Sequence, residues 1–244
     1  MLEPPTPQTL VDALRLFNRK ERFILLEHAT GSGDHLRLGS DFADSLSAAI
    51  GVDVPQGAYL AVDYHLDWLY AAIRTYLGGW STDGGVLHTA DGEPVHAAAL
   101  TASQEDVDLI VAWEKAEISH IIMVEAKAYS GWTNAQLRSK VRRLRQIFDD
   151  DGCPLATRHV GGPHSSIRAH FVLTGFGESA GVDPAGWPPW TIGQTGRPRF
   201  LALRKPTERW GVQRTDADGK PWTAPEGQPQ SWSLRRFGSD QAEK

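Results

Sequence analysis

Two near-continuous apolar runs in the middle of the chain constrain the fold more than any other feature of the sequence. Residues 107–113 (VDLIVAW) and 119–127 (SHIIMVEAK) are rich in β-branched residues and too short for independent helices. Runs of this kind are typical of central strands that are covered on both faces. The segment EKAE between them predicts a polar turn, so we expect the two runs to form a hairpin.

Helical periodicity surrounds this hairpin. Apolar residues that recur at three- and four-residue steps predict four helical segments. These segments are 8–29 (with an interruption at 18–21), 41–50, 63–77 and 133–148. Ser40 or Asp41 is expected to cap the second segment at its N-terminus and Gly51 at its C-terminus. Thr133 or Asn134 is expected to cap the last one, and a further strand is predicted at 168–174.

The composition changes after residue 175. Residues 176–232 contain five of the nine tryptophans among many prolines and glycines. The runs RFLAL and WGVQR predict two strands, which we expect to be joined by a turn at DADGK. We expect the tryptophans to serve packing rather than base stacking. The chain is therefore expected to be an α/β protein in three parts. These are an N-terminal helical segment (1–60), a core (61–175) and a β-rich C-terminal extension packed on the core (176–244).

Composition also limits where the protein works. No apolar run approaches the roughly 20 residues that cross a bilayer, and the first 20 residues do not resemble a secretory signal. Cys153 is the single cysteine, which excludes an internal disulfide and a cysteine-rich zinc site. We expect it to be a small loop residue, and we expect the protein to be cytoplasmic, without membrane partners.

Basic residues are concentrated in one window although the net charge is −5. From residue 126 to 148 there is no acidic residue. The basic residues of this window are Lys127, Arg138, Lys140, Arg142, Arg143 and Arg145. Most of them fall on the helix predicted at 133–148, which predicts a surface that faces phosphates; the alternative is an ordinary solvated helix face.

Two carboxylates and a lysine coincide with the hairpin. Glu125 and Lys127 lie on the same side of their strand because side chains alternate, and a hairpin brings Asp108 beside them. Two carboxylates next to an apolar sheet favour Mg²⁺, and a nearby lysine could orient the attacking water. The alternative for Glu125 and Lys127 is a plain ion pair, and Asp106 or Glu105 could replace Asp108 as the ligand.

This pattern resembles the PD-(D/E)-x-K nuclease superfamily over about residues 60–175. The resemblance implies a restriction-endonuclease-like αβββαβ core with a mixed sheet, and hydrolysis of phosphodiester bonds in DNA. It implies Mg²⁺ as cofactor, with Mn²⁺ as a substitute, and it makes a homodimer a further expectation. Asp108 and Glu125 would be metal ligands and Lys127 the catalytic lysine. Val107 stands where the family has proline.

Several further residues belong to this hypothesis. Gln136 resembles the glutamine that many members place beside the site, and Asp67 or Asp63 could supply a third acidic ligand. The residues expected to contact nucleic acid are Arg138, Lys140, Arg142, Arg145 and Trp132. The alternative function is a non-catalytic protein of nuclease fold that binds nucleic acid or a partner.

Other motifs are interpreted without a function. Asp218-Gly219-Lys220 repeats the acid-x-lysine pattern, but its surroundings predict a turn. His159, His164 and His170 are irregularly spaced and are expected to be loop histidines rather than zinc ligands. The glycine-rich segment 175–181 cannot open a helix, which excludes a dinucleotide-binding loop.

Overall fold

The computed structural model describes most of the chain, in eight ranges. These are residues 7–30, 36–77, 105–128, 132–154, 167–177, 181–205, 208–222 and 231–238. The chain divides into two compact units, Met1–Ala202 and Leu203–Lys244. Each unit has its own sheet, and each is described here by itself.

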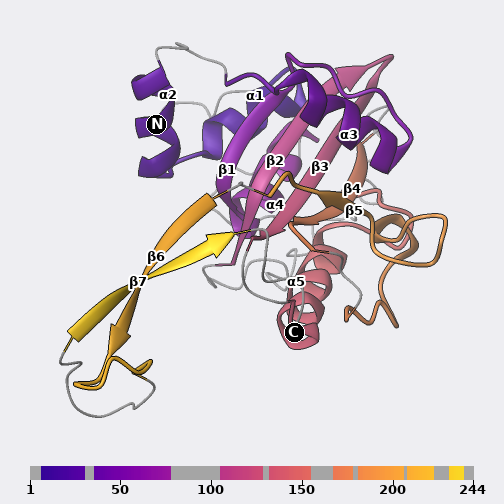
Figure 1. Ribbon diagram of the computed structural model, residues 1–244. Helices are drawn as coiled ribbons and strands as arrows, with labels where there is room; N and C mark the ends of the chain where they lie inside the picture. Colours follow the sequence, from indigo (N-terminus) through magenta and orange to yellow (C-terminus); the bar gives the residue numbers. More distant parts are fainter. Residues whose placement is uncertain are drawn as a thin grey trace. The chain divides into compact units, whose positions relative to one another are not determined.

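The first unit is built on a mixed sheet of five strands, in the order β1-β2-β3-β4-β5 (Figure 1). The strands are β1 (Tyr59–His65), β2 (Asp106–Lys115), β3 (Ile118–Lys127), β4 (Ile167–Gly175) and β5 (Phe200–Ala202). β1, β2 and β3 are antiparallel neighbours, whereas β4 runs parallel to β3 and β5 parallel to β4. The α/β class, the β2–β3 hairpin and the strand at 168–174 are confirmed.

In the described ranges, five α-helices accompany the sheet. They are α1 (Leu10–Phe17), α2 (Glu21–Thr30), α3 (Ser40–Ile50), α4 (Leu66–Tyr76) and α5 (Asn134–Ile147). Gly51 ends α3 with φ 75°, and Thr133 caps α5 by accepting a hydrogen bond from the Gln136 backbone, both as predicted. The predicted cap of α3 was wrong. Gly39 occupies that position, and no side chain satisfies the backbone there.

The strand β1 lies where the sequence predicted no strand and, from residue 63, a helix. The helix begins only at Leu66, after His65 has capped it by accepting a hydrogen bond from the Asp67 amide at 3.2 Å. Residues 59–65 pair with β2 instead, and Asp63 adopts a positive φ of 52°. Pairing with a strand that is distant in sequence has overridden the local helical period.

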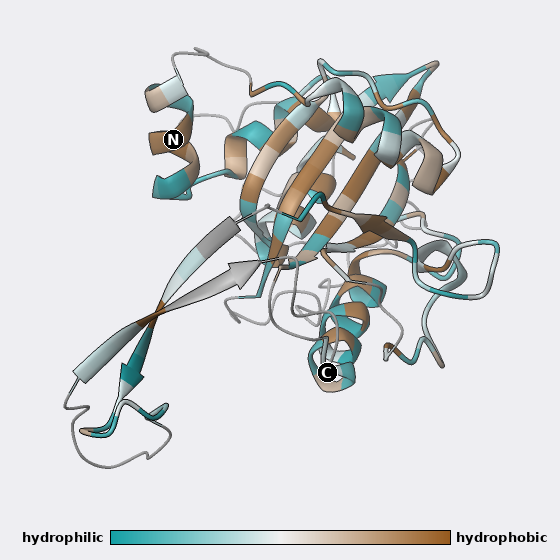
Figure 2. Cartoon of the chain, in the orientation of Figure 1, coloured by the Kyte–Doolittle hydropathy of each residue, from teal (hydrophilic) through white to brown (hydrophobic). Residues whose placement is uncertain are grey.

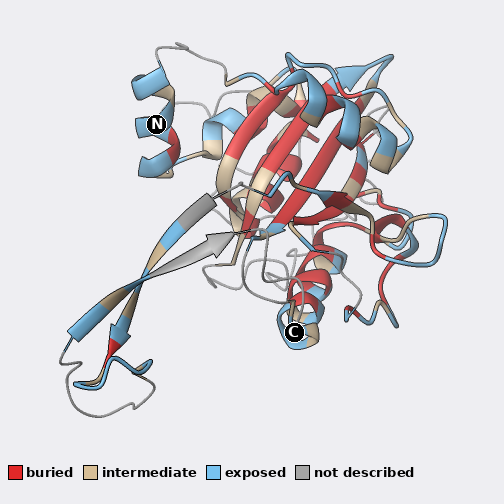
Figure 3. Cartoon of the chain, viewed as in Figure 1, coloured by how far each residue is buried: buried red, intermediate tan, exposed pale blue. Residues whose placement is uncertain are grey.

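The sheet is buried on both faces, as predicted for its central strands. Ile110 and Ile121 point to one face, Val111 and Ile122 to the other, and all four are fully buried. Figure 3 shows the central strands of the sheet mostly in red, the colour of buried residues. Buried side chains of α1, α4 and α5 join one hydrophobic cluster with β1–β4. Figure 2 shows the resulting contrast between the apolar strands and the alternating surface of α5. α5 lies between β3 and β4 in the sequence, so the way it packs on the sheet determines which side chains lie against the C-terminal end of β3.

The predicted C-terminal extension is divided between the two units. The RFLAL run contains β5, which completes the main sheet. The WGVQR run lies in β6 (Glu208–Thr215), which pairs with β7 (Ser231–Gly238) to form a separate two-stranded ribbon. The expectation that DADGK joins the first two runs was therefore wrong. That segment forms a turn after β6, in which Gly219 has φ 77°.

The tryptophans differ between the units. Trp187 and Trp190 are buried in the first unit, as the packing interpretation predicted. Trp210 and Trp232 on the ribbon are 59% and 64% exposed, so for them the prediction was wrong. A ribbon of two strands has no second layer of its own against which they could pack.

Two smaller predictions are also decided. Cys153 lies in a turn-rich segment, as expected, whereas His170 lies on β4 rather than in a loop. His159 and His164 lie outside the described residues. Among the helices of the described ranges, none has the length and apolar character that a membrane crossing requires.

Candidate functional site

The end of β3 and the start of β2 meet as the hairpin predicts. The last paired residues are Leu109 and Val124, and the next position brings Asp108 beside the Glu125–Lys127 segment. The regular ladder does not continue there. Instead, the backbone N–H of Ala126 donates to Asp108 Oδ2 at 2.6 Å. The carboxylate of Asp108 is thereby fixed between the positions of Glu125 and Lys127.

Glu125 is a buried carboxylate with a buried cationic partner. Glu125 is 3% exposed, and its Oε2 forms a short ion pair with Nζ of Lys140, which is 5% exposed. The same ammonium donates to the carbonyl oxygen of Asp106 at 2.5 Å. Burial raises the pKa of Glu125, and Lys140 is the strongest influence in the opposite direction. Lys140 therefore belongs to the site and not to an exposed phosphate-facing surface.

The helical geometry of α5 explains this placement. At about 100° per residue, Lys140 falls roughly 300° around the helix from Leu137, between Leu144 and Ile147. All three apolar residues are buried in the main cluster. Lys140 is thus inside the apolar arc of the helix, and its ammonium binds Glu125 at the end of β3 and the Asp106 carbonyl at the start of β2. This signal was present in the sequence and distinguishes Lys140 from the exposed Arg138, Arg142 and Arg145.

Lys127 and Gln136 occupy more open positions. Lys127 is half-buried at the end of β3, and its charge is the weakest of the influences on the pKa of Glu125. Gln136 is exposed on α5, one helical turn before Lys140. Lys127 follows Glu125 on the same strand, whereas Gln136 is placed only by its position on α5, and both side chains are accessible to solvent.

The other candidate acids are engaged in ion pairs. Asp67 on α4 binds the largely buried Arg143 at 2.5 Å, and Asp63 binds Arg22 at 3.4 Å. The two alternatives to Asp108 are also paired, Asp106 with Lys20 at 2.7 Å and Glu105 with Arg143 at 3.9 Å. Among the described residues, no group of three or more acidic, histidine or cysteine side chains could hold a metal ion. Neither Asp67 nor Asp63 joins Asp108 and Glu125.

The exposed side of α5 is less basic than its sequence suggests. Arg138 lies 3.7 Å from Asp183, and Arg145 lies 2.7 Å from Asp150. Arg142 is exposed, and none of the described acids pairs with it. The predicted contact residue Trp132 packs, partly buried, against the hydrophobic cluster. Because Arg138 and Arg145 are paired with aspartates, Arg142 is the residue of this helix whose charge is most accessible to a ligand.

Two carboxylates at the ends of neighbouring strands suit Mg²⁺ better than a metal ion whose ligands must all come from the protein. Mg²⁺ is commonly bound through one or two carboxylates, with water and phosphate oxygens completing its octahedron. Asp108 and Glu125 meet that requirement, and each has one oxygen engaged by a donor, Ala126 N–H or Lys140. The donor set therefore fits a Mg²⁺ ion that is completed by substrate.

Comparison with known proteins gives no relative. No protein-family model matches the chain, and no curated protein or solved structure matches it either. The residues and their geometry are therefore the basis for a functional assignment.

Proposed function

We propose that this protein is a Mg²⁺-dependent nuclease of the PD-(D/E)-x-K type that hydrolyses phosphodiester bonds in DNA. The observation that carries the proposal is the bond from Ala126 N–H to Asp108 Oδ2, which holds Asp108 beside Glu125 and Lys127. The strand order supports it as well. An antiparallel β1-β2-β3 meander followed by α5 and a parallel β4 agrees with the βββαβ part of that core, with α4 as an additional helix between β1 and β2.

Each residue has a role that follows from its environment. Asp108 and Glu125 would hold Mg²⁺, which when bound polarises a phosphoryl oxygen and lowers the pKa of a bound water. Lys127 is half-buried at the end of β3, where its ammonium can orient the attacking water and stabilise the negative charge that develops on the phosphoryl oxygens. Lys140 holds one oxygen of Glu125 and partly neutralises it, which positions the other oxygen. Lys140 is thus a positioning residue.

Cleavage assays on plasmid, linear duplex, single-stranded DNA and RNA test this proposal directly. We expect the wild type to cleave DNA in the presence of Mg²⁺ or Mn²⁺ and to be inactive in EDTA. Lys127→Ala and Asp108→Asn should each lower the rate at least about 100-fold, as loss of a charge-stabilising group does. Lys115→Ala is the matched control, because Lys115 is an exposed lysine on the same hairpin, paired with Asp53 far from the proposed site.

A wild type that cleaves none of these substrates would contradict the proposal, and so would a Lys127→Ala variant that cleaves as well as Lys115→Ala. Circular dichroism of each variant should show an unchanged fold, so that a loss of rate reports on chemistry.

A second function is supported by the ion pair itself. Because Lys140 already compensates Glu125, the site could be a stable electrostatic centre in a protein that binds nucleic acid without cutting it. Titration calorimetry with Mn²⁺ separates the two functions. If the protein is a nuclease, the wild type should bind Mn²⁺ and the Glu125→Gln variant should not. If it only binds nucleic acid, the wild type and Glu125→Gln should give the same small heat on addition of Mn²⁺.

A further inference from the structure

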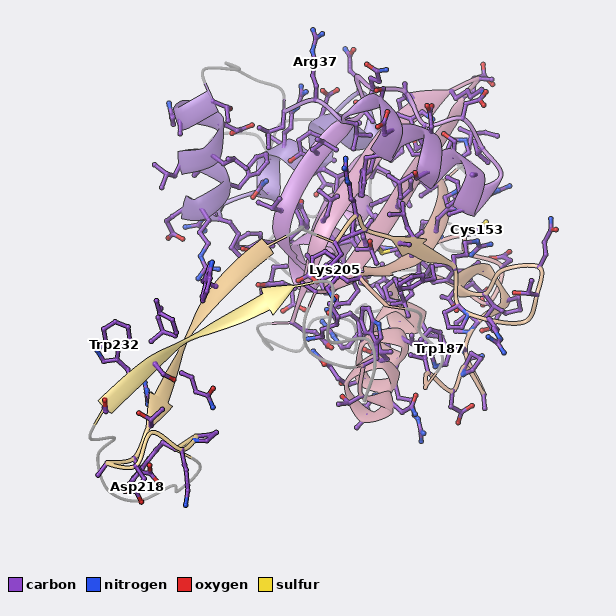
Figure 4. The ribbon with its side chains drawn as sticks, in the orientation of Figure 1. Arg37, Cys153, Trp187, Lys205, Asp218 and Trp232 are labelled. Carbon is purple, nitrogen blue, oxygen red and sulfur yellow. The ribbon has the colours of Figure 1, made fainter. Side chains whose placement is uncertain are left out.

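The ribbon of β6 and β7 exposes an apolar face that is unusual for a two-stranded element. Val212 pairs with Leu234 in the register, and the rows on either side contain Trp210 and Trp232. Directly opposed residues point to the same face of an antiparallel pair. The side chains of Trp210, Val212, Trp232 and Leu234 are 59%, 73%, 64% and 60% exposed. Figure 4 shows Trp232 projecting from the ribbon.

The charge of the ribbon indicates the kind of partner. The two strands contain four arginines and one glutamate, a net +3 in a chain whose total is −5. On the same face, the exposed Arg214 pairs with Trp232 in the register. An aromatic plane beside an arginine is a combination that binds nucleic acid through base stacking and phosphate contacts.

A second copy of the chain would fit this face poorly. Eight-residue strands are about 27 Å long, and two of them side by side are about 10 Å wide, so the face offers on the order of 300 Å². A standard stable interface buries about 800 Å² per partner. Self-association would also bring together two ribbons that each have a net charge of +3, which is electrostatically unfavourable.

The spacing of the tryptophans selects the form of nucleic acid. The rows of Trp210 and Trp232 are four residues apart along the ribbon, which corresponds to about 13 Å. In a duplex the bases are stacked about 3.4 Å apart and present only their edges. Two separated tryptophans can stack on bases only where the bases are unstacked, with Val212 and Leu234 as an apolar floor between them.

We propose that the β6–β7 ribbon is a binding surface for single-stranded nucleic acid, on which Trp210 and Trp232 stack against bases and Arg214 contacts phosphate. The proposal deepens the proposed function, because it assigns unpaired strands as the form in which substrate is held. It also concerns a separate compact unit from that of Asp108 and Glu125. Binding and cleavage can therefore fail independently.

Fluorescence anisotropy with a labelled 20-nucleotide single strand and the matching duplex tests the proposal, with EDTA present to prevent cleavage. We expect the full-length protein to bind the single strand more tightly than the duplex. Trp232→Ala should weaken single-strand binding about 10-fold, within the range of losing one base–aromatic stack. Arg214→Gln should reduce the slope of log affinity against log salt by about one.

Two controls separate stacking from folding of the ribbon. Trp232→Tyr keeps an aromatic plane and cross-strand packing, so it should retain most of the affinity. Leu25→Ser changes an equally exposed apolar residue on α2 and should leave binding unchanged. Equal loss in Trp232→Ala and Trp232→Tyr, or no loss in either, would overturn the stacking role.

The remaining outcomes also decide the matter. If sedimentation shows a dimer that Val212→Ser dissociates, and nucleic-acid affinity is unaffected by that change, the face is a self-association surface and the proposal is wrong. Tight single-strand binding by a protein that cuts nothing in Mg²⁺ would support the ribbon and refute the nuclease. If the protein cleaves DNA but its Trp232→Ala and Arg214→Gln variants bind single strands as tightly as the wild type, the nuclease proposal is supported and the ribbon proposal is refuted.

Discussion

Glu125 and Lys140 form a buried pair between β3 and α5, with side chains 4% and 6% exposed. Removing one partner of such a pair leaves an uncompensated charge in the interior. Lys140→Ala should therefore lower the free energy of unfolding by about 3–5 kcal/mol. Urea denaturation at pH 7 measures the effect, with Lys115→Ala, an exposed lysine, expected to cost less than about 1 kcal/mol.

The double variant Glu125→Leu, Lys140→Met distinguishes a charge effect from a packing effect. Replacing both partners by apolar residues removes the desolvation cost of each, so most of the lost stability should return. If the double variant is as unstable as Lys140→Ala, the ion pair is not the source of the loss.

His170 makes the stability of the fold depend on pH in the acidic range. Burial, followed by the nearby charge of Arg199, lowers the pKa of His170 from 6.5 to about 4. Its Nε2 lies 3.5 Å from Nδ1 of His120. The unfolded chain therefore takes up a proton at this residue before the folded protein does. Stability from this source is complete above about pH 6.5 and is lost as the pH falls towards 4, by about 3 kcal/mol in total.

Urea unfolding between pH 7 and pH 4 measures this loss. His170→Gln should show a flatter dependence over that window, and His28→Gln, on the exposed side of α2, should behave as the wild type. The difference between the two variants isolates His170 from Glu125, whose raised pKa acts in the opposite direction, reducing stability as pH rises above the ordinary glutamate value. Parallel curves for the two histidine variants would contradict the assignment.

At the scale of elements, the contact between β3 and β4 determines where Lys127 lies. Lys127 pairs with Gly175 in the parallel register, and a Cβ at Gly175 would overlap the backbone carbonyl oxygen of Lys127. Gly175→Ala must therefore push the end of β3 away. We expect it to cost about 1–3 kcal/mol, as overpacking does, and to lower cleavage by displacing Lys127.

Gly177→Ala is the matched control, because a Cβ there meets nothing within 4 Å. Both variants should be compared by urea denaturation and by cleavage rate. If Gly175→Ala is as stable and as active as Gly177→Ala, the close approach of the two strands does not position the site.

The elements differ in how much of them the sequence could predict. β2, β3 and α5 were predictable because their apolar patterns are local and strong. β1 was not, because residues 63–77 continue a helical period and the partner strand of 59–65 begins only at Asp106. The contact between Asp108 and the Glu125–Lys127 segment followed from the hairpin. The helical period places Lys140 in the apolar arc of α5, but its pairing with Glu125 depends on how α5 is rotated against the sheet. That rotation depends on tertiary packing.

For the whole molecule, the division after Ala202 predicts which truncated proteins will still fold. Residues 183–202 supply β5 and the buried Trp187 and Trp190 to the first unit. Losing each large buried aromatic costs about 3–5 kcal/mol, and a domain of this kind has only about 5–15 kcal/mol in total. Deleting residues 183–244 should therefore abolish cooperative unfolding.

Deleting only residues 203–244 removes the ribbon and none of the main sheet. The shortened protein should keep a cooperative urea transition with an unchanged midpoint, because none of the described residues beyond 202 belongs to its hydrophobic cluster. It should also retain Mg²⁺-dependent cleavage while losing affinity for single strands, since catalytic and binding residues belong to different units. A shortened protein that has no cooperative transition would show that the ribbon stabilises the fold, and the two units would then have to be treated as one.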